Sequence, residues 1–177
     1  RTGPLFDIDG LNVKPDFFTL AKGIAGGFPF GAFAMTEEVA LKLQKGDHGG
    51  TYCGNPLGCA VAYAVIKHLM ETDVGKNVES VGSFIYDNLK TLQQAHPAVI
   101  KTVRGKGLLL AMEMREPQIA ADILDKSLKL GLFVNLTQGN VIRVFPALNI
   151  RKEEAEEGLE LLKKAITMVA EEHERAG

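Results

Sequence analysis

The stretch Asp16-Phe-Phe-Thr-Leu-Ala-Lys22-Gly-Ile-Ala-Gly-Gly27 decides how the rest of the chain is interpreted. Phe17, Phe18 and Leu20 form an apolar run that predicts a short strand, and a lysine then precedes several glycines. An amine among apolar neighbours loses solvation of its charged form, which favours its use as a nucleophile toward an aldehyde. The glycines let the backbone pass close to a flat ligand. A strand that ends in a glycine turn, with the lysine amine reaching solvent, explains the same residues.

The same segment resembles that of a known family. Thr19-Leu-Ala-Lys22-Gly, followed by Gly26-Gly27-Phe-Pro29-Phe-Gly31-Ala32, is similar to the cofactor-lysine segment of the class III pyridoxal-phosphate aminotransferases, most closely their acetylornithine and ornithine branch. The resemblance implies that Lys22 is catalytic and binds the aldehyde of pyridoxal 5'-phosphate. It also implies an α/β chain, the C-terminal part of a fold type I, aspartate-aminotransferase-like transferase.

A loop follows in Lys45-Gly-Asp-His-Gly-Gly-Thr51-Tyr-Cys-Gly-Asn55-Pro56, whose small and turn-forming residues predict a long exposed connection. The Thr51 hydroxyl among glycine amides suits an anion, although a plain connector explains the loop as well. The run resembles the family's His-Gly-x-Thr-x-x-Gly-Asn-Pro motif, whose threonine binds the cofactor phosphate of the neighbouring subunit. The resemblance therefore implies that Thr51 binds cofactor in a homodimer with shared active sites.

A second charged residue of interest lies in Asn140-Val-Ile-Arg143-Val-Phe-Pro146. Alternation along a strand places Arg143 on the face opposite Ile142 and Val144. An arginine in an apolar strand needs a partner, which is either a structural carboxylate or a ligand carboxylate that matches its planar guanidinium. The segment resembles the family's Arg-x-x-Pro motif, which implies that Arg143 binds the substrate α-carboxylate.

The remaining pattern predicts two domains, residues 1–73 as the end of a large cofactor-binding domain and residues 74–177 as a small α+β domain. Residues 31–35 predict a buried strand, and the mostly apolar residues 57–71 predict a buried helix. Beyond residue 74 we expect helices over 74–97, 117–130 and 155–169, and strands over 99–103, 108–114, 132–136 and 141–144. Arg104 resembles an arginine of the family, and we expect it to hold the turn over 104–107 by a hydrogen bond.

Composition limits the alternatives. The chain has 20 basic and 22 acidic residues, which argues against a nucleic-acid partner. No apolar run approaches the ~20 residues that span a membrane, and we expect a cytoplasmic protein. Cys53 and Cys59 are expected to be reduced thiols, and the spacing of the four histidines predicts no metal site.

The resemblance implies transfer of an amino group from N-acetylornithine to 2-oxoglutarate, giving N-acetylglutamate semialdehyde and glutamate in arginine biosynthesis. An ornithine or 4-aminobutyrate aminotransferase, an aminomutase, and a non-catalytic folding or dimerisation module remain alternatives. In the family the Arg-Thr-Gly run that opens this chain lies inside the polypeptide, after an aspartate that contacts the pyridine nitrogen. We therefore expect a C-terminal portion of a longer enzyme, inactive on its own.

Overall fold

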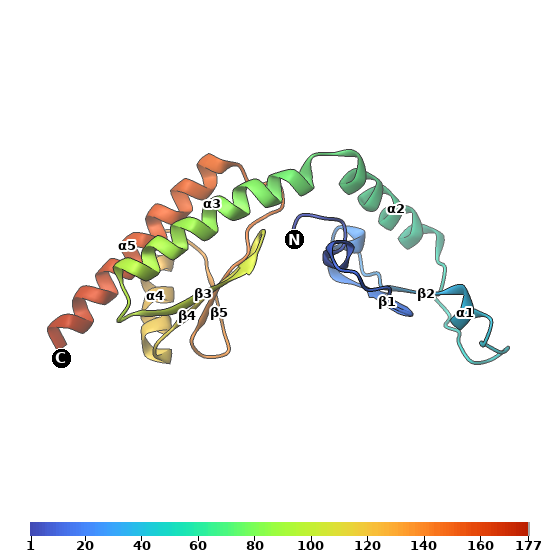
Figure 1. The fold of residues 1–177 in the computed structure, drawn as a ribbon, viewed down its shortest axis with the longest axis horizontal. Coiled ribbons are helices and arrows are strands. Elements are labelled where there is room, and N and C mark those ends of the chain that lie inside the picture. The colour runs from blue at the N-terminus through green and yellow to red at the C-terminus, as the bar shows by residue number, and fades with distance from the viewer. Residues whose placement is uncertain (177) are drawn as a thin grey trace. The chain divides into compact units, whose positions relative to one another are not determined.

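The computed structural model describes residues 1–176, which divide into two compact units. One unit combines Arg1–Phe6 with the chain from Val74 onward, and the other spans Asp7–Asp73 (Figure 1). Residues 1–6 therefore group with the C-terminal part of the chain, whereas the sequence pattern had assigned them to residues 1–73. Within the described residues, no helix combines the length and the apolar character needed to cross a membrane.

The unit Asp7–Asp73 is built on a small antiparallel pair of strands. Its elements are η1 (Asp7–Gly10), β1 (Phe17–Leu20), η2 (Lys22–Ala25), β2 (Ala32–Met35), α1 (Glu37–Ala40) and α2 (Pro56–Glu71). Phe17 of β1 pairs with Met35 of β2, and Leu20 pairs with Ala32. Both strands form where the sequence predicts them, but β2 is not buried as expected, because the described residues leave this two-stranded pair largely open.

Helix α2 begins one residue before the predicted range. Pro56 is its first residue, and the side-chain oxygen of Asn55 accepts a hydrogen bond from the Gly58 amide at 2.7 Å. The expectation that this helix is buried is wrong for the described chain. Only Gly58, which lies against the Phe30 ring, and Ala62 are buried. The apolar residues Leu57, Tyr63 and Met70 are more than 60% exposed.

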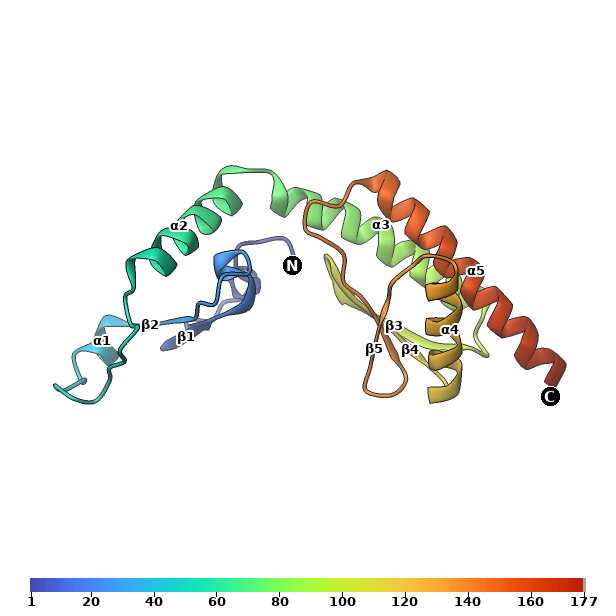
Figure 2. The same ribbon diagram turned by 180° about the vertical axis from the view of Figure 1, so that it is seen from behind.

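The other unit is a four-stranded antiparallel sheet with helices over one face. Its elements are α3 (Val74–Ala95), β3 (Ile100–Lys106), β4 (Leu109–Met114), α4 (Pro117–Lys129), β5 (Asn135–Thr137), β6 (Val141–Val144) and α5 (Lys152–Ala176). The strand order is β3-β4-β6-β5. Helices α3 and α5 lie side by side, with α4 packed against α5 (Figure 2). The helices and the four strands of this α+β unit all overlap the ranges that the sequence predicts for them.

The core of this unit follows the two expected periodicities. Alternate residues of β4 and β6 point toward the helices, and every third or fourth residue of α3 and α5 meets them. The side chains of this core include Val78, Ile85, Leu89, Val103, Leu110, Met112, Met114, Ile123, Ile142, Leu159, Leu162 and Ile166. Among residues 1–176, no helix covers the opposite face of the sheet, where Arg143 is exposed.

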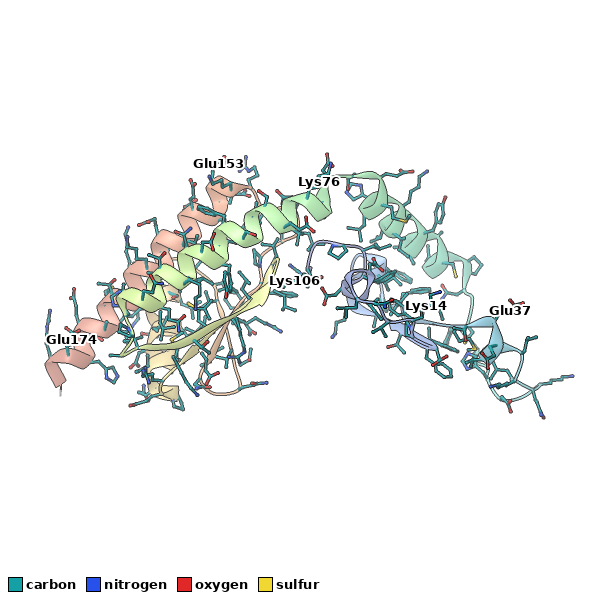
Figure 3. The ribbon with its side chains drawn as sticks, viewed as in Figure 1. Lys14, Glu37, Lys76, Lys106, Glu153 and Glu174 are labelled. Carbon is teal, nitrogen blue, oxygen red and sulfur yellow. The ribbon has the colours of Figure 1, made fainter. Side chains whose placement is uncertain are left out.

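Three details of this unit differ from the sequence prediction. Strand β3 continues through Arg104 to Lys106, so the turn to β4 is shorter than expected. Helix α4 ends at Lys129, one residue before the predicted end, and Leu128 in its last turn is 50% exposed. Arg104 does not hold the turn, since its guanidinium bonds to Glu113 on the neighbouring strand. The outer side of α5 is polar, with Glu153 and Glu174 exposed near its two ends (Figure 3).

Candidate active site

Lys22 occupies an unusual backbone position. Strand β1 ends at Leu20, and Lys22 begins η2. The backbone φ of Lys22 is 57°, in the left-handed region that residues other than glycine rarely adopt. Gln138 is the only other non-glycine residue with positive φ in the described chain, and it lies in the β5–β6 hairpin turn, where such a value is ordinary. Lys22 lies in no tight hairpin turn, so its positive φ has no such explanation. Backbone strain from a positive φ is often found at functional sites.

The side chain of Lys22 does not have the apolar surroundings expected from its sequence neighbours. The residue is exposed, and it makes no ion pair with any residue among 1–176. Helix η2 ends at Ala25, and the residue after it, Gly26, has a left-handed φ of 59°. The result is a primary amine on a constrained backbone that is open to an incoming ligand.

Thr51 lies in the exposed loop between α1 and α2, as predicted. The rings of His48 and Phe33 form a T-shaped pair with centroids 4.8 Å apart, which joins this loop to β2. Residues 29–33 and 50–55, with Cys59, line a shallow hollow of about 590 Å³. Thr51 is one of its lining residues and presents a hydroxyl there, while Lys22 is not part of this lining.

Arg143 lies in the other unit, on the open face of the sheet. Its neighbours Ile142 and Val144 turn toward the core, as the alternation of β6 predicts. The guanidinium carbon lies 5.0 Å from the centroid of the Phe145 ring, a cation–π distance. The cross-strand partners of Arg143 are the small Ala111 on one side and the polar Asn135 on the other.

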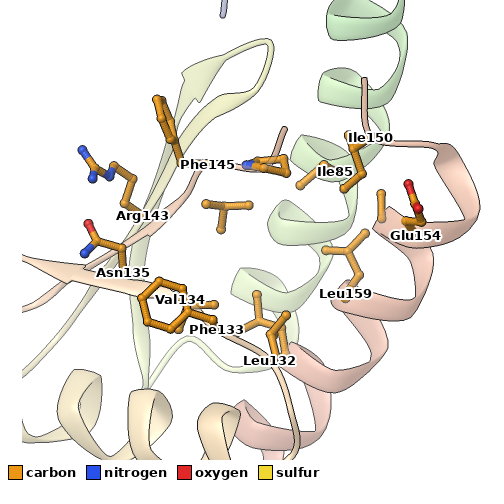
Figure 4. A pocket seen from close by; sticks show the side chains of 15 residues that line it. Ile85, Leu132, Phe133, Val134, Asn135, Arg143, Phe145, Ile150, Glu154 and Leu159 are labelled. Atoms are coloured by element: carbon orange, nitrogen blue, oxygen red, sulfur yellow. The ribbon is translucent and has the colours of Figure 1, made fainter. Parts of the chain in front are cut away.

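Arg143 has no structural carboxylate partner among residues 1–176. It lines an apolar cavity of about 370 Å³, in which Glu154 supplies the acidic group (Figure 4). That carboxylate accepts hydrogen bonds from the Arg151 guanidinium and amide, both at 2.9 Å, and these bonds lower the pKa of Glu154. The first of the two explanations offered by the sequence, a structural ion pair, is therefore not found.

The three predicted residues fall into different units. Lys22 and Thr51 belong to Asp7–Asp73, and Arg143 belongs to the other unit. Two residues near Arg143 were missed. Asn135 could have been found, because a hairpin centred on Gly139 places it opposite Arg143. Arg1, whose guanidinium carbon lies 3.6 Å from the Phe145 centroid, carries no local sequence signal of that contact.

A comparison with known proteins decides the family. The model for the family "Aminotransferase class-III" matches residues 1–166. The chain belongs to the class-III aminotransferases. Its mixed α/β fold is that of this family of pyridoxal-phosphate enzymes, and the family implies pyridoxal phosphate as the cofactor.

Named relatives of this class-III chain point to one branch. It is 38% identical over 169 residues to an acetylornithine aminotransferase of Caldanaerobacter subterraneus subsp. tengcongensis, covering 96% of this chain and 42% of that protein. It is 42% identical over 166 residues to a mitochondrial acetylornithine aminotransferase of Yarrowia lipolytica, covering 94% and 39%. The chain thus spans about two fifths of the length of these relatives.

Solved structures of class-III aminotransferases match closely. An ornithine delta-aminotransferase of Plasmodium falciparum gives a TM-score of 0.89 at 33% identity, over 97% of this chain and 45% of that chain. A Toxoplasma gondii ornithine aminotransferase with partial occupancy of PLP at its active site gives 0.91 at 32% identity, over 98% and 42%. An acetylornithine aminotransferase of Elizabethkingia anophelis gives 0.88 at 31% identity, over 95% and 43%.

The side chains of this class-III chain suit the cofactor in two respects. Lys22 offers an exposed primary amine, the group that condenses with an aldehyde. Thr51 offers an exposed hydroxyl beside Gly50 and close to Gly54, in an exposed loop, and a hydroxyl can donate to a phosphate oxygen. The chemistry of these groups therefore fits pyridoxal phosphate.

Proposed function

We propose that the protein containing this chain is a pyridoxal-phosphate-dependent transaminase that moves the terminal amino group of N-acetylornithine to 2-oxoglutarate. The products are N-acetylglutamate semialdehyde and glutamate, and the reaction belongs to arginine biosynthesis. Two observations carry the proposal: Lys22 has an exposed amine without an ion-pair partner among residues 1–176, and Arg143 has no carboxylate partner among the same residues. The names of the relatives support the donor.

Each of the three residues has a defined task in this proposal. Pyridoxal phosphate, when bound, supplies an aldehyde for amines and a ring that withdraws electrons from the reacting carbon. Lys22 would hold the cofactor through its Nζ atom, and its free amine would move a proton at the reacting carbon of the substrate. Thr51 donates its hydroxyl to the cofactor phosphate of a partner subunit, and Arg143 binds a substrate carboxylate through its guanidinium.

Substitution of the lysine tests the proposal in the full-length enzyme. Lys22→Ala should lower kcat by about 10³-fold or more and remove the visible absorbance of the bound cofactor. Lys14→Ala is the matched control, because Lys14 is another exposed lysine of the same unit. A Lys22→Ala enzyme that keeps its absorbance band and turns over at the control rate would contradict the assignment.

Ornithine is the alternative donor that a specific observation favours. Two of the solved structures most similar to this chain are named ornithine aminotransferases. Rates measured side by side with acetylornithine, ornithine and 4-aminobutyrate separate the candidates. A kcat/KM that is higher for ornithine or 4-aminobutyrate than for acetylornithine would refute the proposed donor and leave the reaction class intact.

The chain of 177 residues is proposed to lack transaminase activity by itself and to bind pyridoxal phosphate weakly. It covers about two fifths of its relatives, so groups that those proteins place elsewhere are not available to it. Mixing this chain with the cofactor and recording the absorbance of the lysine adduct tests this point. We also propose that the full-length protein forms a homodimer and acts in the cytoplasm.

A further inference from the structure

Two arginines that lie far apart in the sequence, Arg1 and Arg143, contact the ring of Phe145. The guanidinium carbon of Arg1 lies 3.6 Å from the centroid of the Phe145 ring, and that of Arg143 lies 5.0 Å from the same centroid. Arg1 also donates a hydrogen bond from its guanidinium to the carbonyl oxygen of Pro146. Arg1 thus contacts both the Phe145 ring and the carbonyl group of Pro146, the two residues that follow β6.

The backbone of Arg1 is hydrogen-bonded to the β3–β4 turn of the same unit. Its carbonyl oxygen accepts a hydrogen bond from the Leu108 amide at 2.9 Å, and Leu108 is fully buried. The approach is close at Gly107 as well, since a Cβ atom added there would lie 2.5 Å from the Arg1 carbonyl oxygen. The guanidinium of Arg1 is therefore presented to Phe145 from a fixed point on the β3–β4 turn.

The charges of the two arginines act on each other. Loss of hydration lowers the pKa of Arg1, and the nearby positive charge of Arg143 lowers it further. Arginine side chains carry a positive charge in proteins. Their repulsion disfavours positions in which the Arg143 guanidinium approaches Arg1, and the pair together favours a bound anion.

We infer that Arg1 is a positioning residue for the carboxylate-binding Arg143, and that it acts by fixing the Phe145 ring on which the Arg143 guanidinium rests. The inference rests on the proposed function, in which Arg143 binds a substrate carboxylate. Because Arg1 contacts the Phe145 ring, the ring can adopt fewer positions. The Arg143 guanidinium, which contacts the same ring, is restricted as a result. A planar guanidinium held in place loses less freedom when it forms two parallel bonds to a carboxylate.

The test measures KM and kcat of the full-length enzyme for a donor with its carboxylate and for the matching amine without it. Arg143→Gln should raise KM for the carboxylate donor by about 10- to 100-fold. Arg1→Gln should raise the same KM by about fivefold, with kcat unchanged within about twofold, and should leave the decarboxylated donor unaffected. Arg1→Lys, which keeps a cation near the ring, should restore part of the affinity.

Two comparisons separate a positioning role from a structural one. Arg115→Gln is the matched control, because the Arg115 guanidinium also donates to a proline carbonyl, that of Pro97 at 2.6 Å. If Arg1 acts through the ring, the double variant Arg1→Gln with Phe145→Leu should raise KM no more than Phe145→Leu alone. The melting temperature of each variant shows whether the fold is kept.

The outcomes distinguish the inference from the function beneath it. If Arg143→Gln leaves KM for the carboxylate donor unchanged, the proposed role of Arg143 fails and the inference fails with it. If Arg143→Gln acts as expected but Arg1→Gln matches Arg115→Gln, only the inference is overturned. It is also overturned if Arg1→Gln affects both donors equally, or if the effects of Arg1→Gln and Phe145→Leu simply add.

Discussion

Asn135 lies directly opposite Arg143 across the β5–β6 pair, on the open face of the sheet. On the other side of Arg143 the cross-strand partner is Ala111, whose methyl group fills little space. The side-chain amide of Asn135 makes no hydrogen bond to another residue within the described part of the chain. Figure 4 shows the polar ends of Asn135 and Arg143 turned away from the apolar interior formed by Ile85 and Leu159. The pair therefore forms a polar edge on a mostly apolar cavity.

Asn135→Asp is predicted to weaken binding of a substrate carboxylate. The new carboxylate would stand opposite Arg143 and pair with it, so a ligand would have to displace an internal partner. We expect KM for the carboxylate donor to rise by about tenfold in the full-length enzyme. Asn135→Ala is the control that removes the amide without adding charge. An equal rise for both variants would mean that the amide itself, and not competition for Arg143, sets the affinity.

Two glycine-to-alanine changes in helices are predicted to have opposite effects. In α3, a Cβ atom at Gly82 would lie 2.5 Å from the carbonyl group of Gly107, so Gly82→Ala should destabilise the unit by about 1–3 kcal/mol. In α5, a Cβ atom at Gly158 would meet Leu132 at an ordinary 3.7 Å. Gly158→Ala should stabilise by about 0.5–1 kcal/mol, because glycine is a poor helix former. Urea unfolding of both variants measures the contrast, and equal effects would contradict it.

The sequence predicts the C-terminal unit well because its patterns are local. Alternation in β6 placed Arg143 opposite to Ile142, and helical spacing found the buried side of α5. The same methods fail where the answer depends on distant chain. The apolar residues of α2 predicted burial, but within the described residues few groups are present to cover them. The contact of Arg1 with Phe145 joins residues 144 positions apart, and no local pattern reports it.

Local context also misled the prediction for Lys22. Its neighbours in sequence are apolar, yet the residue is exposed, because β1 ends before it and η2 turns with the lysine on the outside. Its positive φ could not be predicted either, since lysine has no preference for the left-handed region. The choice of Lys22 came from the resemblance of the whole segment to a family, and the exposed amine is compatible with that choice.

Hydrogen exchange is predicted to divide the chain of 177 residues at its two units. The unit with β3–β6 has a continuous apolar core, whereas only Ala25 and Ala62 are buried apolar residues within Asp7–Asp73. Amides of α3, β4 and β6 should therefore exchange orders of magnitude more slowly than those of α2, β1 and β2. Mass spectrometry of peptides after timed exchange measures the difference. Equal protection of α2 and α3 would show that the smaller unit is stable without further cover.

Glu113 is predicted to make stability depend on pH in the acid range. Its carboxylate accepts hydrogen bonds from Lys101 at 2.6 Å and from Arg104 at 2.7 Å, and these bonds lower the pKa of Glu113. Because the folded state holds the ionised form more strongly, the group stabilises the fold above the ordinary glutamate pKa of about 4.3. That contribution is lost as the pH falls through the lowered folded-state value.

Urea midpoints of the wild type and of Glu113→Gln, measured from neutral to acid pH, test this dependence. The wild type should be the more stable protein at pH 7, and the gap between the two should close as the pH falls below the ordinary glutamate range. Glu160→Gln in α5 is the matched control, since Glu160 is exposed and makes no ion pair with residues 1–176. A gap that stays constant over the whole pH range would show that Glu113 acts by packing alone. A wider gap in acid would reverse the predicted sign and rule out the ionised carboxylate as the stabilising form.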